Sequence, residues 1–442
     1  MKGAKNRNIK DWLQGSGLAQ QLFRGGAGNL LARVAEVILS LAVAVLLAQL
    51  LGASGYGIYA FVLALASIAA MPAQAGLPSL IVRETARGQQ AFDWPAIRGI
   101  WRWSNGAALL FSLLTSTVAV AGLWLGWGRG EALWETIVWA LGLVPLLALI
   151  AIRLACLRGL RHVLAGVLPE LVLRPALLAA ALLVIQIATN ATISPGDAMA
   201  LTFSATLIVF VITTLLLRRY CSPEISDARP IYRHREWMKA AWPMALTQGF
   251  EKLNRYADLL LLGLLAATVD VGIYRVAAQG ALLASFGLSA LNMVIAPYAA
   301  RLNAEQAHHK LQVLVYRTAQ ISLAFAIPTT LLFSIFGESL LVTLFGDDFR
   351  NAYLPLLVLA AGQVVNAWFG PTGQLLTMTG YERDVTRSAA IAAGLNITLN
   401  ILLIPKYGAL GAAFATSISL AAWNVWLWRV AWLRLKIRCS AI

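Results

Sequence analysis

The chain has 442 residues, of which 59% are hydrophobic and only 12% are charged. A soluble domain typically carries about 25% charged residues, so this composition excludes an ordinary soluble globular protein and favours one built for lipid. The formal net charge is +15, which by itself would suit nucleic acid, a membrane surface or an anionic ligand.

Long apolar runs follow one another along the whole chain. A helix needs roughly 20 apolar residues to cross a bilayer, and twelve such runs are centred near residues 41, 68, 113, 142, 177, 208, 253, 285, 325, 365, 395 and 419. The first run begins only near Asn29, after a basic and weakly amphipathic stretch. We therefore expect an interfacial segment there and not a cleaved signal peptide.

The basic residues are distributed unequally between the two sides of the membrane. With a cytoplasmic N-terminus and alternating spans, the cytoplasmic segments hold 27 of the 35 Lys and Arg, and the outer loops hold only Arg129, Arg350 and Lys406. The positive-inside rule predicts this asymmetry. The charge therefore indicates topology, with both termini cytoplasmic, and not nucleic-acid binding. The scattered cysteines and histidines give no disulfide framework, metal site or cofactor site.

A repeated motif divides the chain into two halves. "LLGASGYGIYAF" and "LLAATVDVGIYRVA" each place Gly-Ile-Tyr after a Leu-rich run, and their glycines, Gly57 and Gly272, are 215 residues apart. The same offset aligns Glu36 with Glu251. The pattern predicts an all-α membrane protein of about twelve transmembrane helices, arranged as two pseudo-symmetric six-helix bundles around a central cavity.

The hydrophilic breaks give the domain boundaries. We expect an N-terminal cytoplasmic or interfacial segment, a first bundle, a cytoplasmic linker, a second bundle and a cytoplasmic tail. Their ranges are 1–28, 29–217, 218–238, 239–428 and 429–442.

Two stretches resemble a known transporter family. "LLGASGYGIYAFVLALASIAAMPAQAGLPSLIVRETAR" is similar to the opening of the polysaccharide (O-antigen type) flippases of the multidrug/oligosaccharidyl-lipid/polysaccharide exporter superfamily. "NILLIPKYGALGAAFATSIS" resembles the link between their last two helices. The resemblance implies a transporter of the bacterial cytoplasmic membrane that moves an undecaprenyl-diphosphate-linked oligosaccharide to the outer leaflet by alternating access. It also implies contact with membrane lipids and with a polymerase of the same pathway.

Ionisable residues inside the spans are costly, at roughly 3 kcal/mol each on insertion scales. They must therefore face a bundle interior, a water-filled cavity or one another. Several share one helical stripe, as Glu251, Arg255 and Asp258 do. The nine residues of this kind are Arg33, Glu36, Glu170, Arg174, Glu251, Lys252, Arg255, Asp258 and Arg275.

These residues suggest an anion site and a coupling site. Two cations within one helical turn repel each other, and an anionic ligand explains keeping both. We therefore predict a substrate site, which the resemblance makes a pyrophosphate site, at Arg33, Lys252, Arg255 and Arg275, with Arg174 as a further member. The predicted coupling carboxylates are Glu36, Glu251, Asp258 and Glu170. The alternative is that these groups form structural ion pairs, for example Glu170 with Arg174 at i,i+4 spacing.

Two other functions compete with lipid-linked oligosaccharide transport. A multidrug or cation exporter of the same superfamily would want a cavity dominated by carboxylates. A membrane-embedded polysaccharide polymerase would be an enzyme and would need a sizeable outer loop with acid–base groups. The longest outer loops, "GWGRGEALWE" and "FGESLLVTLFGDDFRN", are short and contain no histidine. We therefore expect a transporter and not an enzyme.

Overall fold

The computed structural model describes residues 17–74, 76–124, 131–189, 193–437 and 439–441. The described residues are helical or lie in short connections. The helices of the N-terminal half are α2 Gly17–Ala69, α3 Met71–Gln74, α4 Leu77–Ala91, α5 Trp94–Trp124, α6 Glu131–Gly159, the π-helical turn η1 Pro169–Leu173, α7 Arg174–Thr189, α8 Pro195–Tyr220 and the short α9 Pro223–Asp227. Those of the C-terminal half are α10 His234–Leu265, α11 Thr268–Ala304, α12 His308–Phe345, the 3-10 turn η2 Asp347–Ala352, α13 Tyr353–Phe369, α14 Thr372–Met378 and α15 Glu382–Leu435.

The helices account for the expected number of membrane crossings. Within the described ranges, nine helical segments are long and apolar enough to span a bilayer. Two of them contain a sharp break and provide two crossings each, one in α2 at Gly52 (φ 65°) and one in α15 at Gly408 (φ 52°). Helix α10 is long enough to cross but carries charges in its middle. Together these segments give twelve crossings, as predicted.

Glycine produces both breaks because it adopts positive φ without a steric penalty from Cβ. Each break lets one continuous helical stretch reverse direction at the membrane surface. We call the end of the molecule with these two breaks the turn end. The opposite end, which carries residues 221–233 between α8 and α10, is the linker end.

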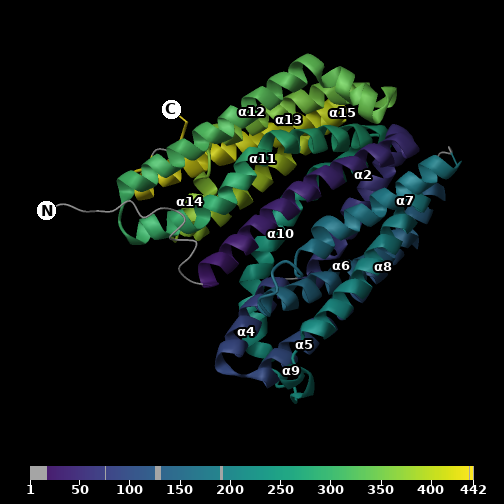
Figure 1. Cartoon of the computed structure of the whole chain (residues 1–442). Coiled ribbons are helices and arrows are strands. Elements are labelled where there is room, and N and C mark those ends of the chain that lie inside the picture. The colour runs from purple at the N-terminus through teal and green to yellow at the C-terminus, as the bar shows by residue number, and fades with distance from the viewer. Residues whose placement is uncertain (1–16, 75, 125–130, 190–192, 438, 442) are drawn as a thin grey trace.

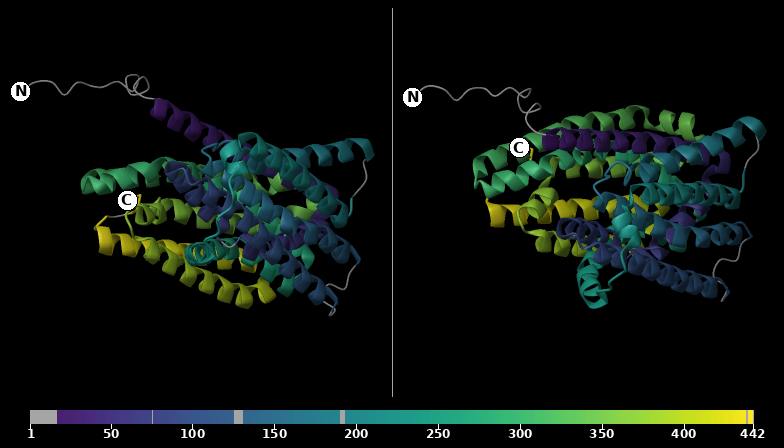
Figure 2. Two further views of the ribbon diagram at one scale, coloured as in Figure 1. Left: turned by 90° about the horizontal axis from the view of Figure 1, so that it is seen from below. Right: turned by 60° about the horizontal axis from the view of Figure 1, so that its bottom comes forward.

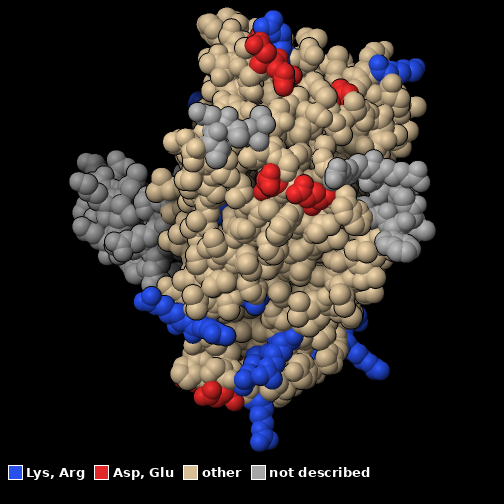
Figure 3. Space-filling model, turned by 90° about the vertical axis from the view of Figure 1, so that its right-hand side faces the viewer, with Lys and Arg blue, Asp and Glu red and all other residues tan. Residues whose placement is uncertain are grey.

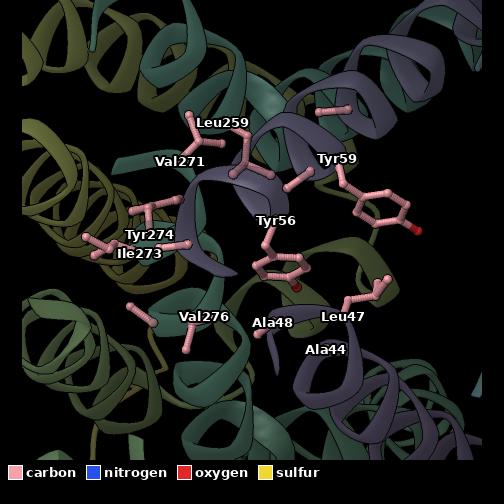
Figure 4. Close-up of a cluster of buried hydrophobic side chains, with 14 of the residues drawn as sticks. Ala44, Leu47, Ala48, Tyr56, Tyr59, Leu259, Val271, Ile273, Tyr274 and Val276 are labelled. Atoms are coloured by element: carbon pink, nitrogen blue, oxygen red, sulfur yellow. The ribbon is translucent and has the colours of Figure 1, made fainter. Parts of the chain in front are cut away.

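The two halves form separate lobes. Figures 1 and 2 show α4 to α9 gathered on one side and α12 to α15 on the other. Helices α2 and α11 pack along each other where the lobes meet. One apolar cluster crosses this boundary and includes Leu47 and Tyr56 of α2 with Val271 and Tyr274 of α11, as Figure 4 shows. The predicted two-bundle architecture is confirmed.

The linker is docked onto the N-terminal lobe. The Ile231 amide donates to the Pro95 carbonyl (3.1 Å), and Arg233 pairs with Asp93 at 3.0 Å. The first turns of α10 then place Trp237 in an apolar cluster of the N-terminal lobe. Helix α10 therefore begins on one lobe and continues along the other.

Charged side chains are sparse over most of the surface. In Figure 3 the basic side chains gather mainly toward the lower rim of the molecule, a few acidic side chains lie in the middle and near the top, and most of the remaining surface is uncharged. Contact with hydrocarbon requires such sparse charge, because a charge there would lose its hydration. The chain is a multi-pass membrane protein.

Candidate functional site

A cavity of about 650 Å³ lies between the two lobes. Helices α2, α6, α7 and α8 line it from the N-terminal lobe, and α10 and α11 line it from the C-terminal lobe. Its volume falls within the range of small-molecule sites, roughly 300–1,000 Å³. The polar and charged side chains that line it include Ser40, Gln74, Arg158, Glu170, Arg174, Gln248, Lys252, Arg255, Arg275 and Gln279.

Positive charge dominates the described lining of this cavity. Five cations, Arg158, Arg174, Lys252, Arg255 and Arg275, stand against one carboxylate, Glu170. Because like charges in a poorly hydrated chamber repel one another, this excess is unfavourable unless water or an anion offsets it. The cavity can therefore hold an anion, and guanidinium groups can hold it in a bidentate manner.

Most of the predicted anion-site residues meet in this cavity. Arg174, Lys252, Arg255 and Arg275 all line it although they come from both lobes. The Lys252 ammonium donates a hydrogen bond to Gln74 Oε1, which joins α10 to the N-terminal lobe. The geometry thus brings together four of the five residues that the sequence predicts for one anion site.

Arg33 and Glu36 lie elsewhere. They form an ion pair with each other at 2.9 Å, with the Arg33 side chain 49% exposed, and neither lines the cavity. Ser40, one helical turn further along α2, does line it. Arg33 therefore lies apart from the other predicted anion-site residues in this conformation. The side chain of Glu251 lies outside the described part of the structure.

The structural ion pair between Glu170 and Arg174, which was the alternative to a role for these residues in binding, does not form. Both side chains line the cavity, but no ion pair joins them among the described residues. Residues Pro169–Leu173 form a π-helical turn. Such a turn has more residues than an α-helical turn, so the side-chain directions along it are not those of a regular α-helix. Both groups therefore remain available to a ligand.

Arg158 is a cavity residue that the sequence pattern does not predict. It stands in the last turn of α6, where the sequence suggests an ordinary basic residue at a helix end. Its position in the fold turns it toward the cavity instead, near Glu170. The only sequence signal was its proximity to the predicted span, which it shares with many basic residues.

Asp258 is buried beside the cavity in the C-terminal lobe. Its side chain is only 6% exposed and does not line the cavity. It accepts hydrogen bonds from the Tyr274 hydroxyl (2.7 Å), the Thr416 hydroxyl (2.8 Å) and the Asn400 amide (2.8 Å). These partners come from α11 and from both arms of α15. A cation or proton at this carboxylate would therefore change hydrogen bonds to three helical segments.

The sequence repeat shows that Asp258 has no acidic counterpart in the N-terminal lobe. In the C-terminal lobe Tyr274 and Thr416 lie 3.0 Å apart, and in the N-terminal lobe Tyr59 and Thr202 make the corresponding hydrogen bond at 2.9 Å. Each pair member is displaced by 214 or 215 residues. At the position of the acid, however, the N-terminal lobe has Val43. The tyrosine–threonine pair is common to both lobes, and the carboxylate belongs to one.

The two Gly-Ile-Tyr motifs meet at the turn end of the cavity. A Cβ on Gly57 would lie 1.8 Å from the Thr268 carbonyl oxygen, and one on Gly272 would lie 2.2 Å from the Ala53 carbonyl oxygen. Ser54 and Thr268 also share a hydrogen bond of 3.0 Å between their hydroxyls. The backbones of α2 and α11 therefore touch reciprocally, and we call this contact the glycine seal. Only glycine permits so close an approach.

A two-lobed helical bundle with a cavity between its lobes and a close contact at one end defines a membrane-transporter fold. The family model described as "Polysaccharide biosynthesis protein" matches residues 22–303. The chain belongs to this family.

Curated relatives match over part of their length. The probable low-salt glycan biosynthesis flippase Agl15 of Haloferax volcanii is 23% identical over 166 residues, covering 38% of this chain and 35% of the relative. The capsular polysaccharide biosynthesis protein CapF of Staphylococcus aureus is 23% identical over 226 residues, covering 50% of this chain and 57% of the relative. The matched regions thus span about a third to somewhat over half of these relatives.

Solved structures share the fold over nearly the whole chain. An inward-facing multidrug resistance MATE family transporter of the MOP superfamily has a TM-score of 0.73 at 16% identity, covering 92% of this chain and 98% of that one. The lipid II flippase MurJ in an inward closed conformation has a TM-score of 0.71 at 13% identity, covering 92% and 87%. At these identities the likeness establishes the architecture.

Proposed function

We propose that the protein is a transporter that flips an undecaprenyl-diphosphate-linked oligosaccharide across the cytoplasmic membrane by alternating access, for the assembly of a surface polysaccharide. The observation that carries this proposal is the cavity between the lobes, where five described cations face one carboxylate. The family to which the chain belongs supports a role in polysaccharide synthesis. The relatives include a protein described as a probable flippase, which supports the proposal that this protein flips a lipid-linked glycan.

The chemistry of the cavity suits the pyrophosphate and the sugars of such a substrate. A pyrophosphate would take bidentate hydrogen bonds from arginine and a point charge from lysine. Gln248, Gln279 and Ser40 offer amide and hydroxyl groups to sugars, and Tyr56 adds an aromatic surface beside Arg275. An inside-negative membrane would drive the anion outward, by roughly 2.3 kcal/mol per charge per 100 mV if it crosses the full potential.

A multidrug or cation exporter is the competing reading. The MATE likeness concerns the fold, which such exporters share. A site for organic cations would need carboxylates facing the ligand, because desolvated cations repel one another. The described lining has the opposite balance, so the cavity favours an anionic substrate.

The direct test is transport by the purified protein in liposomes. We expect it to move a fluorescent undecaprenyl-diphosphate disaccharide between leaflets, measured by a membrane-impermeant quencher. An organic cation, ethidium, serves as the competing substrate in the same vesicles. Transport of ethidium without transport of the lipid would reject the proposal in favour of the exporter.

We propose that the linker end faces the cytoplasm of a bacterial cell. The positive-inside partition of the sequence supports this orientation. We expect a reporter fused after Lys239 to behave as cytoplasmic, and one inserted after Asp348, at the turn end, to behave as external. Alkaline phosphatase and green fluorescent protein fusions measure the two sides. The opposite pattern at both positions would reverse the orientation and the direction of transport.

Asp258 is the carboxylate that we propose for coupling transport to an ion. It is buried, bonded to two helices besides its own, and has no acidic counterpart in the other lobe. A proton or a monovalent cation would neutralise it and alter its hydrogen bonds with Tyr274 and Asn400. Asp258→Asn keeps the shape and removes the charge. We expect this variant to bind substrate but to lose the dependence of transport on a proton or sodium gradient.

The matched control for this variant lies in the other lobe. Thr202→Val removes one hydrogen bond at the position related by the repeat and leaves the carboxylate in place. We expect the control to keep its gradient dependence. The measurement is the rate in liposomes with an imposed gradient of pH or of sodium. A normal gradient response from Asp258→Asn would show that coupling lies elsewhere.

A further inference from the structure

A second hollow lies at the linker end of the C-terminal lobe. Its volume is about 820 Å³, and it shares no lining residue with the central cavity. Three segments form it: the turn between α11 and α12, the turn between α14 and α15, and the chain just after α15. We call it the terminal groove. Its principal polar lining residues are Asn303, His308, His309, Tyr381, Arg434 and Lys436.

The terminal groove is electropositive. Among its described lining residues are Arg434, Lys436 and two histidines, and none is acidic. Arg434 lies 3.5 Å from Asp384 and stacks over the Tyr381 ring at 5.9 Å, which fixes its guanidinium group at the edge of the groove. Lys436 has no such carboxylate partner within 4.0 Å in the described structure. Its charge is therefore free for a ligand.

The hollow lies where several helices begin or end. Helix α12 begins at His308, so the partial positive charge of its N-terminus faces the hollow, and the C-terminal ends of α11, α14 and α15 border it as well. Lys436 follows the last turn of α15 in a left-handed conformation (φ 58°), which ends the helix and turns the chain into the groove wall. The end of α15 thus places the side-chain cations Arg434 and Lys436 beside the start of α12.

The position of the groove indicates where its ligand comes from. It lies at the ends of three membrane-spanning helices, where lipid headgroups meet water. On α15, immediately before the groove residues, Leu433 is 58% exposed on the outside of the bundle. Basic pockets between transmembrane helices bind anionic phospholipid headgroups, and the acyl chains then lie along the neighbouring helices.

We propose that the terminal groove binds the phosphate-bearing headgroup of an anionic membrane phospholipid. Lys436 and Arg434 contact the phosphate, and the imidazoles of His308 and His309 stand beside them as further polar groups. Almost all of its lining residues follow residue 303, where the family match ends, so the site is separate from the matched region. A bound lipid would join the α11–α12 turn to the end of α15. The proposal does not depend on the substrate of the central cavity.

A diffuse basic surface is the competing explanation, since this end of the protein carries many Lys and Arg. The two accounts differ in whether position matters. Lys310 and Arg383 are exposed at the same end but do not line the groove. The double variant Lys310→Gln/Arg383→Gln therefore removes the same formal charge as Arg434→Gln/Lys436→Gln and leaves the groove intact.

The experiment is native mass spectrometry of the full-length protein titrated with dioleoylphosphatidylglycerol or dioleoylphosphatidylcholine. We expect tight retention of one phosphatidylglycerol, at least about tenfold weaker binding in the groove variant, and less than about a twofold change in the control. Equal losses in both variants, or no loss in either, would overturn the proposal. Size-exclusion profiles and melting temperatures identify any misfolded variant.

If the groove variant misfolds, Lys436→Gln alone provides the same comparison against Lys310→Gln. A second arm replaces the lipid with inorganic phosphate. Displacement of phosphatidylglycerol only at high phosphate concentration supports a lipid site. Tight phosphate binding without retention of phosphatidylglycerol would instead indicate a site for a soluble anion and would overturn the lipid assignment.

Discussion

Arg275→Ala and Arg255→Ala are each expected to lower transport of a pyrophosphate-linked oligosaccharide by roughly ten- to a hundredfold. The reason is that a hydrogen bond to a charged group contributes about 1.5–3 kcal/mol, and each alanine removes such donors from the cavity. Arg255→Lys keeps the charge and loses the bidentate geometry, so it should retain part of the activity. The measurement is the initial flipping rate in liposomes at equal amounts of inserted protein.

Arg33→Ala is the control for these variants. Arg33 lies on α2 but pairs with Glu36 outside the cavity, so its loss should change the rate less than about threefold, as expected for an exposed ion pair. If Arg33→Ala impairs transport as strongly as Arg275→Ala, position in the cavity does not matter. If Arg255→Ala and Arg275→Ala insert normally and transport normally, these arginines do not bind the substrate.

Gly57→Ala is expected to open the glycine seal. Its Cβ would lie 1.8 Å from the Thr268 carbonyl oxygen, a distance that no relaxation of a side chain can relieve because the obstructing atom belongs to the backbone. The lobes must therefore separate at the turn end. Every 1.4 kcal/mol lost by the sealed conformation raises the ratio of open to sealed molecules about tenfold. We expect Gly272→Ala to act in the same way.

Accessibility of the cavity from the turn end measures this shift. A single cysteine at Ala60, which lines the cavity, is introduced into a background in which the native cysteines are replaced. A membrane-impermeant maleimide added at the turn end should label it at least about ten times faster in Gly57→Ala. Gly106→Ala, where a Cβ would meet no atom within 4 Å, is the control. Unchanged labelling in both seal variants would show that the glycines do not close the cavity.

The sequence by itself determined the architecture, because membrane insertion depends on local composition. A run of roughly 20 apolar residues must become a helix in lipid, since its backbone groups have no other hydrogen-bond partners there. The repeat at Gly57 and Gly272 was also visible, as was the excess of cations within the spans. Lys252, Arg255 and Arg275 can therefore be assigned to a cavity from the sequence.

Helix periodicity could not decide what each charged residue would face. Arg255 and Asp258 share a stripe on α10, yet only Arg255 lines the cavity. The helix passes from the gap between the lobes into the packed C-terminal lobe, where Asp258 meets Tyr274 and Asn400. In the same way, Ser40 on α2 lines the cavity and Arg33 does not. Residues in one stripe point in the same direction from the helix axis. The segments that the stripe faces, however, change along the length of the helix.

Only the tertiary structure decided how distant segments are combined. The repeat indicated that Gly57 and Gly272 are equivalent, but only the packed lobes place their backbones in contact. Arg158 enters the cavity and Lys436 enters the terminal groove because elements far apart in the chain converge there. Hydropathy and spacing record the local preference of each segment for lipid or water. The pairing of segments depends on contacts among residues that can be hundreds of positions apart, which no local pattern specifies.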